Sequence, residues 1–235
     1  MLEVKNLSFK LGQHTLLSDI SFNIKAGSFV CVAGANGSGK TLLLKLICGI
    51  LKPSGGEVLI NGKNIAAYNT KERSALMRYQ PAAPSIGFDY KVEDIVLMGT
   101  NPALDWWGEY TQKNKQAAVD AMRKTNCLTF AKRNISTLST GEMQRVFIAQ
   151  TLSSKPLLVL PDEPTSHLDL KQKEEIFKIF AQVASSGGAV ICATHDIYLV
   201  RKYATHALLL KGGSLGLFAE TKDISKEKIE EVYDL

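Results

Sequence analysis

The sequence predicts an α/β protein with a mostly parallel core sheet, an N-terminal antiparallel β subdomain and an inserted α-helical subdomain. Continuous apolar runs at residues 29–33, 157–160 and 189–194 predict strands that are buried on both faces. A glycine-rich stretch follows the first run, and an amphipathic helical pattern at 171–184 separates the other two. Strands that alternate with helices in this way indicate parallel strands joined by crossovers.

The other predicted elements follow from side-chain periodicity and from the positions of glycines. Alternating apolar and polar side chains predict strands near the N-terminus, and Gly12 and Gly27 mark turns there. Gly212 and Gly213 mark a late hairpin. In chain order, these elements are strands at 2–9 and 17–24, a helix at 42–51, a strand at 57–61, hairpin strands at 208–210 and 215–219, and a C-terminal helix at 225–233.

A helical pattern with only weak strand signals covers residues 81–152. This stretch is too long for one crossover, which needs about a dozen residues. We therefore expect an inserted helical subdomain within a single domain that spans residues 1–235. Trp106 and Trp107 lie in this insert, and they predict either local core packing or a hydrophobic contact with a membrane subunit.

The composition is that of a soluble globular protein, with 45% hydrophobic and 22% charged residues. No apolar run approaches the ~18–20 residues of a membrane-spanning helix, and no signal-peptide pattern is present, so we expect a cytoplasmic protein. The net charge is +5, and the basic residues are dispersed, which argues against a nucleic-acid partner. Reduced, mostly buried thiols are expected at Cys31, Cys48, Cys127 and Cys192.

A phosphate-binding loop is predicted directly after the first apolar strand. Its backbone N–H groups can cradle phosphate oxygens, and the N-terminus of the next helix adds positive potential. Lys40 would contact the outer phosphates of ATP, and the Thr41 hydroxyl would bind Mg²⁺. The loop matches G-x-x-x-x-G-K-[ST] in full: Gly34, Ala35, Asn36, Gly37, Ser38, Gly39, Lys40 and Thr41.

Two adjacent carboxylates, Asp162 and Glu163, follow the apolar run at 157–160. The carboxyl end of a parallel strand is where ligands bind in such sheets. Asp162 is therefore expected to orient Mg²⁺ through water, and Glu163 to polarise the attacking water as general base. The sequence predicts a P-loop NTPase core.

Further motifs accompany the phosphate loop and the acidic pair. Residues 138–142 read Leu-Ser-Thr-Gly-Glu, residues 166–169 follow the acidic pair, and residues 193–196 end the next buried strand. Gln80 lies forty residues after Lys40. In this order and spacing, the chain resembles the nucleotide-binding subunit of an ABC transporter over essentially its whole length.

The resemblance implies roles for five residues. Gln80 would contact Mg²⁺ and sense the membrane partner. Ser139 and Gly141 would close over the γ-phosphate of ATP held by the opposite protomer. Asp169 would bridge the protomers, and His195 would contact the γ-phosphate. The implied active unit is a head-to-tail dimer with two shared ATP sites, in which Lys40, Glu163 and His195 are catalytic.

The chain departs from the family pattern at four positions. Leu11 stands where an aromatic residue usually stacks on adenine, and Phe9 could replace that ring. Thr140 replaces a second glycine, and Glu142 replaces a glutamine. Pro161 precedes the acidic pair and removes a backbone N–H from a central strand. None of these changes removes a phosphate or Mg²⁺ contact.

Residues 95–99 and Pro102 resemble the coupling region of importers for iron-siderophores, haem and cobalamin. Thr100 and Ala103 replace the arginine and histidine that are usual there. The resemblance implies a separate membrane permease, a substrate-binding protein and a peripheral location on the inner face of the cell membrane.

Two other classes of protein remain open from the residues. A soluble ABC ATPase that acts on ribosomes or DNA would usually carry two cassettes or a long coiled coil, and this chain shows neither. A kinase-like P-loop protein would not need the motif at 138–142. Co-purification of the chain from native membranes would separate a transporter subunit from both.

Overall fold

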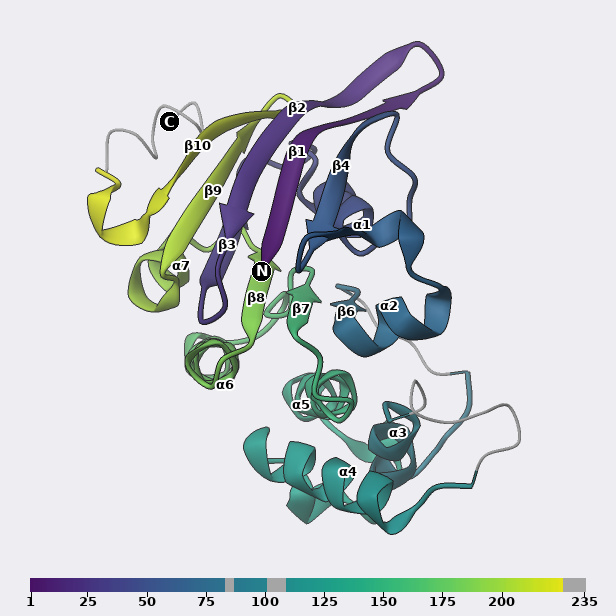
Figure 1. The fold of residues 1–235 in the computed structure, drawn as a ribbon. Coiled ribbons are helices and arrows are strands. Elements are labelled where there is room, and N and C mark those ends of the chain that lie inside the picture. The colour runs from purple at the N-terminus through teal and green to yellow at the C-terminus, as the bar shows by residue number, and fades with distance from the viewer. Residues whose placement is uncertain (83–86, 101–108, 226–235) are drawn as a thin grey trace.

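The computed structural model describes residues 1–82, 87–100 and 109–225, and these form a twisted sheet flanked by helices (Figure 1). In this part of the chain, ten strands follow the order β5-β4-β1-β2-β10-β9-β3-β8-β7-β6. The first strands pair antiparallel, and β9, β3, β8, β7 and β6 pair in parallel. This confirms the predicted fold class. Pro102, Ala103, Trp106, Trp107 and nearly all of the predicted C-terminal helix lie outside the described residues.

Most of the ten strands were predicted from the sequence. The strand at Phe29–Ala33 and the late hairpin are confirmed, whereas β6 was not predicted. In chain order, the strands are β1 (Leu2–Leu11), β2 (His14–Ile24), β3 (Phe29–Ala33), β4 (Gly55–Ile60), β5 (Lys63–Asn64), β6 (Met77–Gln80), β7 (Leu158–Pro161), β8 (Ala189–Ala193), β9 (His206–Lys211) and β10 (Ser214–Glu220).

Seven α-helices are present in the described ranges, and short 3-10 turns join several of them. In chain order, they are α1 (Lys40–Ile47), α2 (Thr70–Leu76), α3 (Val92–Met98), α4 (Gln112–Lys124), α5 (Thr140–Leu152), α6 (Leu170–Ser185) and α7 (Ile197–Tyr203). No helix in residues 1–82, 87–100 or 109–225 is both long and apolar enough to cross a bilayer.

The helix predicted at 42–51 is present as α1, but the prediction is wrong at both ends. It begins at Lys40, directly after the phosphate loop, and ends at Ile47. Gly49, with a φ of 70°, terminates it. The N–H of Gly49 donates to Leu46 O (3.1 Å), and the N–H of Ile50 donates to Lys45 O (3.0 Å). These bonds satisfy carbonyls that the helix end would otherwise leave unpaired.

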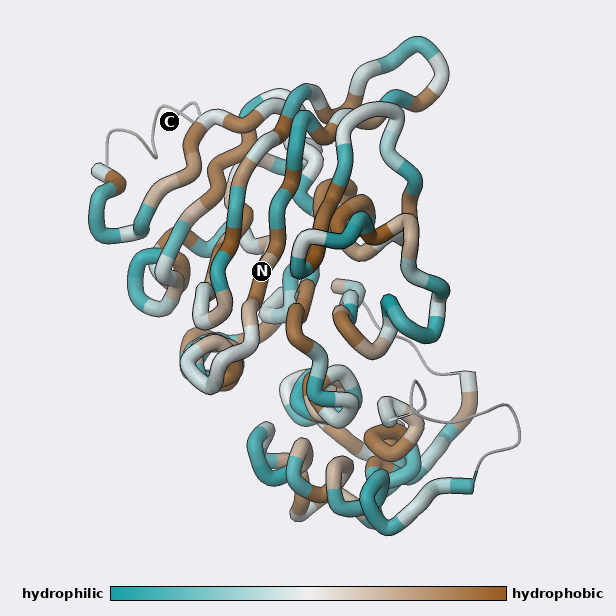
Figure 2. The backbone as a smooth tube through the Cα atoms, viewed as in Figure 1, coloured by the Kyte–Doolittle hydropathy of each residue, from teal (hydrophilic) through white to brown (hydrophobic). Residues whose placement is uncertain are grey.

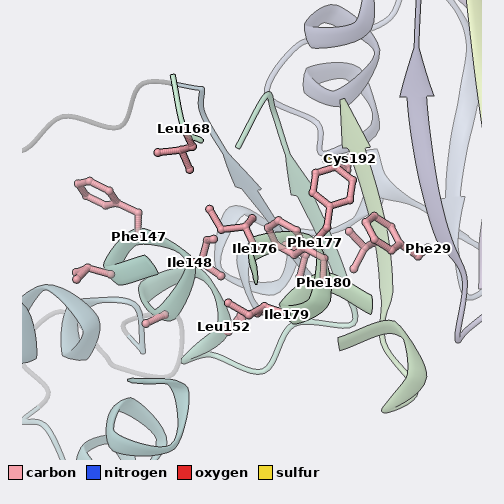
Figure 3. Packing of buried hydrophobic residues seen from close by; sticks show 14 of the residues in the cluster. Phe29, Phe147, Ile148, Leu152, Leu168, Ile176, Phe177, Ile179, Phe180 and Cys192 are labelled. Atoms are coloured by element: carbon pink, nitrogen blue, oxygen red, sulfur yellow. The ribbon is translucent and has the colours of Figure 1, made fainter. Parts of the chain in front are cut away.

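The sheet separates two layers of apolar side chains. Along β3, Phe29 and Cys31 face one cluster and Val30 and Val32 face the other, as the two-residue period of a strand requires. Helix α1 covers the second cluster, while α5, α6 and α7 cover the first. The central strands are largely hydrophobic along the backbone trace (Figure 2). On the first side, aromatic rings of α6 pack against Phe29 (Figure 3).

Helices α3, α4 and α5 lie together beyond the α6 side of the sheet (Figure 1). Their inward side chains, such as Val96, Met122 and Val146, belong to the same apolar cluster as Phe29 and Phe177. The helical segment is thus held to the sheet through a continuous core. The boundaries of the insert at about residues 81 and 152 stay a prediction.

Gly99 is expected to be required where α3 ends against α5. A Cβ there would collide with the carbonyl oxygen of Gln150 and the hydroxyl of Ser153. Gly99→Ala should therefore destabilise the protein by about 1–3 kcal/mol through overpacking. Gly87→Ala is the matched control, because its Cβ would meet open space. Urea unfolding of both variants checks this, and equal midpoints would contradict the packing that we describe.

Candidate functional site

The phosphate loop joins β3 to α1 through backbone conformations that favour glycine. Gly39 precedes the helix with a φ of 100°, and Gly37 has a φ of 81°. A Cβ on Gly39 would collide with the side chain of Leu17 from β2. Both glycines therefore serve the turn of the backbone, and Gly39 also serves its close approach to β2. The structure brings together all eight predicted loop residues at the carboxyl end of β3.

The ammonium group of Lys40 lies at the centre of this loop. Its side chain is buried, and Nζ donates to Gly34 O (2.9 Å) and Ala35 O (3.1 Å). Nζ also lies 4.0 Å from Glu163 Oε1. A positive charge is thus held between the loop and the acidic pair, where it can attract phosphate oxygens.

Asp162 is buried at the end of β7, with 2% of its surface exposed. Thr41 Oγ1 donates to Oδ1 (3.0 Å), and Tyr79 OH donates to Oδ2 (2.9 Å). Burial raises the pKa of Tyr79, and the Asp162 carboxylate raises it further, so the phenol remains a donor at neutral pH. The sequence did not identify Tyr79, since no motif marks it and β6 was not predicted.

Glu163 has a left-handed backbone with a φ of 47°, which is uncommon outside glycine. Its N–H donates to Ala193 O (3.0 Å), which joins it to the end of β8. Its Oε2 lies 2.7 Å from His195 Nδ1. Because a carboxylate only accepts hydrogen bonds, Nδ1 carries the proton, and Nε2 is left for another partner. The arrangement can polarise a water molecule beside the phosphate loop.

One open cavity of about 460 Å³ lies between these groups. The phosphate loop forms one wall, and the residues that follow β7 and β8 form the other. Its lining residues are Gly34, Ala35, Asn36, Glu163 and His195. The predicted catalytic residues Glu163 and His195 therefore line the same space. The ammonium group of Lys40 contacts three of the lining residues, Gly34, Ala35 and Glu163.

The oxygen donors beside this cavity suit Mg²⁺, which prefers carboxylate, hydroxyl and amide oxygens. Thr41 and Asp162 already share a hydrogen bond. Gln80 ends β6 opposite Pro161, and the residue is 2% exposed. Neither polar atom of its side-chain amide has a hydrogen-bond partner among the described residues. A buried amide without a partner is costly unless a ligand satisfies it, so these three residues fit a Mg²⁺ site.

Ser139, Gly141 and Asp169 lie apart from the cavity lining. Ser139 caps α5, and Asp169 caps α6 by accepting from the N–H of Gln172 (2.8 Å). A Cβ on Gly141 would collide with the Gln172 amide, so the two helix starts are in close contact. The structure therefore brings these three predicted ATP-binding residues near one another, but not to the cavity of their own chain.

The residues predicted for the adenine end differ in exposure. Leu11, at the end of β1, is 66% exposed. Phe9 is half-buried and packs against the apolar cluster under α1. The ring of Phe9 is therefore already engaged in the core, which makes Leu11 the freer side chain.

The chain is similar to known proteins over most or all of its length. A family model described as ABC transporter matches residues 17–166. A hemin import ATP-binding protein from Methylobacillus flagellatus is 36% identical, and the match covers 100% of this chain and 90% of that protein.

Two solved structures extend the comparison. One is described as a metal-chelate type ABC transporter in an inward-facing conformation, with 30% identity, a TM-score of 0.87, and coverage of 100% of this chain and 89% of that chain. The other is a dimeric ATP-binding cassette bound to ADP and phosphate, with 27% identity, a TM-score of 0.81, and coverage of 95% and 100%.

Glu163→Gln is expected to bind Mg·ATP but to hydrolyse it at least about 100-fold more slowly, because an amide cannot accept the proton of the attacking water. An ATP-bound dimer should accumulate. ATPase rates and size-exclusion mass in ATP provide the measurements. Glu220→Gln, which removes an exposed carboxylate at the end of β10, is the charge-matched control. Turnover near the wild-type rate in Glu163→Gln would remove Glu163 from the chemistry.

The affinities of the protein for ATP and GTP are expected to differ by no more than about tenfold, because Leu11 cannot stack on a base. A stacked ring is worth ~1–3 kcal/mol, so Leu11→Tyr should tighten ATP binding with little change in turnover at saturation. Phe9→Ala tests the alternative that Phe9 supplies the ring. The affinities of the wild type, Leu11→Tyr and Phe9→Ala for ATP and GTP distinguish the two. A large loss of ATP affinity in Phe9→Ala, with no gain in Leu11→Tyr, would show that Phe9 stacks on the base and would contradict our assignment of Leu11.

Proposed function

This chain belongs to the ABC transporter family, and we propose that it powers the import of a metal chelate, such as haem or an iron-siderophore, through a separate membrane permease. The comparisons confirm that the chain is the ATP-binding subunit of an ABC transporter and an ATPase that uses ATP and Mg²⁺. They support this prediction over the alternative of a soluble ABC ATPase that takes no part in transport. The observation that carries the chemistry is the cavity that the phosphate loop shares with Glu163 and His195.

The residues divide the reaction between them. The backbone of the phosphate loop and Lys40 bind the phosphates of ATP. Thr41, Gln80 and Asp162 would hold Mg²⁺, with Asp162 acting through water. Bound Mg²⁺ would offset negative charge on the phosphates. Glu163 would take the proton of the attacking water, and its bond to His195 would orient both side chains.

We propose further that each ATP site is shared by two copies of the chain. Ser139, Gly141 and Asp169 do not line the cavity of their own chain, although the family pattern assigns them to ATP. Their position at the adjacent starts of α5 and α6 would let them close on the nucleotide of a second copy. The dimeric assembly of a structural relative supports this proposal.

The direction of transport and the substrate class are proposed from the relatives. One relative that matches the chain over its full length is named for hemin import, and a structural relative is described as metal-chelate type. The proposed partners are an integral permease, which would hold this subunit at the inner face of the membrane, and a substrate-binding protein. Nucleic acid is not among the proposed partners.

Uptake measurements test the proposed substrate class. Cells of the source organism that carry Glu163→Gln in place of the wild-type chain should lose uptake of haem, a ferric siderophore or cobalamin, while Glu220→Gln should leave it unchanged. The tagged wild-type chain should co-purify from native membranes with an integral subunit. Normal uptake of all three compounds would contradict the proposed cargo, and loss of efflux would indicate an exporter.

A mixture of two inactive variants tests the shared sites. Lys40→Ala damages the phosphate loop, and Ser139→Ala damages the residue proposed to act on the partner's ATP. Their heterodimer would contain one intact site and one doubly damaged site. An equal mixture should regain roughly a quarter of wild-type ATPase activity, since half of the dimers carry one of two sites. No recovery, with heterodimers shown to form by mass, would contradict a shared site.

A further inference from the structure

The start of α5 carries a carboxylate beside the serine that we propose to meet the partner's ATP. Ser139 Oγ donates to Glu142 Oε2 (2.9 Å), and the N–H of Ser139 donates to the same oxygen (2.8 Å). In return, the N–H of Glu142 donates to Ser139 Oγ (3.3 Å). This reciprocal cap commits the one hydroxyl proton of Ser139 to Glu142.

Glu142 is ionised at neutral pH. Its bonds from the Ser139 N–H and hydroxyl hold the pKa of this carboxyl below its usual range, and Arg133 and Arg145 lower it further. Its side chain is 27% exposed, so its charge reaches the surface of the helix start. Any anion that approaches Ser139 must approach this charge as well.

Arg133 is the cation that faces Glu142 most directly. Its Nη1 lies 3.9 Å from Glu142 Oε1. Its Nη2 donates to Thr137 O (2.6 Å), and its guanidinium lies over the Phe130 ring, 5.7 Å from the centroid. These contacts fix the guanidinium beside the carboxylate. The other nearby cation, Arg145, is bound to Glu175 of α6 at 3.0 Å.

We propose that Glu142 opposes the ATP-driven closing of the dimer, and that Arg133 is a positioning residue that reduces this opposition by pairing with Glu142. The inference rests on the shared site proposed above. There, the γ-phosphate held by one copy would meet Ser139 of the other, and the carboxylate of Glu142 would compete for the same hydroxyl proton. ATP then closes the dimer less readily than it would with a neutral side chain at this position.

Glu142→Gln is the direct test, because the amide oxygen can keep both bonds from Ser139 while the negative charge is lost. The KM for ATP should fall by roughly two- to fivefold, the range expected for one partly exposed charge, with a smaller change in kcat. In a Glu163→Gln background, dimer should also form at lower ATP concentration by size exclusion. Glu220→Gln, the charge-matched control, should change neither value.

Arg133→Gln separates charge pairing from a merely structural role. It should raise the KM for ATP in the wild-type background and have a clearly smaller effect when combined with Glu142→Gln, since there is then no carboxylate to neutralise. Equal effects in the two backgrounds would mean that Arg133 only supports the fold, and would overturn its proposed role.

The outcomes separate this inference from the shared site. If the Lys40→Ala and Ser139→Ala mixture recovers activity while Glu142→Gln leaves KM and dimer formation unchanged, Glu142 does not oppose closing and only this inference is lost. If the mixture recovers nothing, the shared site itself is lost. A higher KM in Glu142→Gln would reverse the sign that we assign to Glu142.

Discussion

Parallel pairing of β3, β8, β7 and β6 brings the groups that are predicted to bind ATP to one edge of the sheet. Phe29 pairs with Val190, Leu158 with Ala189, and Gln80 with Pro161, so these strands end close together. The phosphate loop and the acidic pair directly follow the ends of β3 and β7, and His195 lies two residues after the end of β8. A slip in register would separate them, because each group extends from its strand with almost no intervening chain.

Two adjacent carboxylates have different surroundings at this edge. Asp162 is buried and accepts from two hydroxyl groups, which offset part of the cost of burying its charge. Glu163 turns away through a left-handed backbone and faces Lys40 and His195 instead. The left-handed conformation would thus separate the metal-orienting role that we propose for Asp162 from the proton-accepting role that we propose for Glu163.

The edge that we propose to meet the ATP of a second copy lies at the starts of α5 and α6. Close contact of Gly141 with Gln172 and the ion pair of Arg145 with Glu175 join the two helices there. Ser139 and Asp169, which cap these two helices, consequently lie near one another. A change in the charge of this edge, as at Glu142, would alter its interaction with a phosphate without changing the cavity lined by Glu163 and His195.

Short, continuous patterns of residues were sufficient to predict the buried strand Phe29–Ala33, the phosphate loop, the acidic pair and the α/β order. The other features depend on contacts between distant parts of the chain. Strand β6 reads Met-Arg-Tyr-Gln, which has no continuous apolar run, so it forms only because β7 pairs with it. The bond from Tyr79 to Asp162 joins residues 83 positions apart, and such a contact exists only once the sheet has formed.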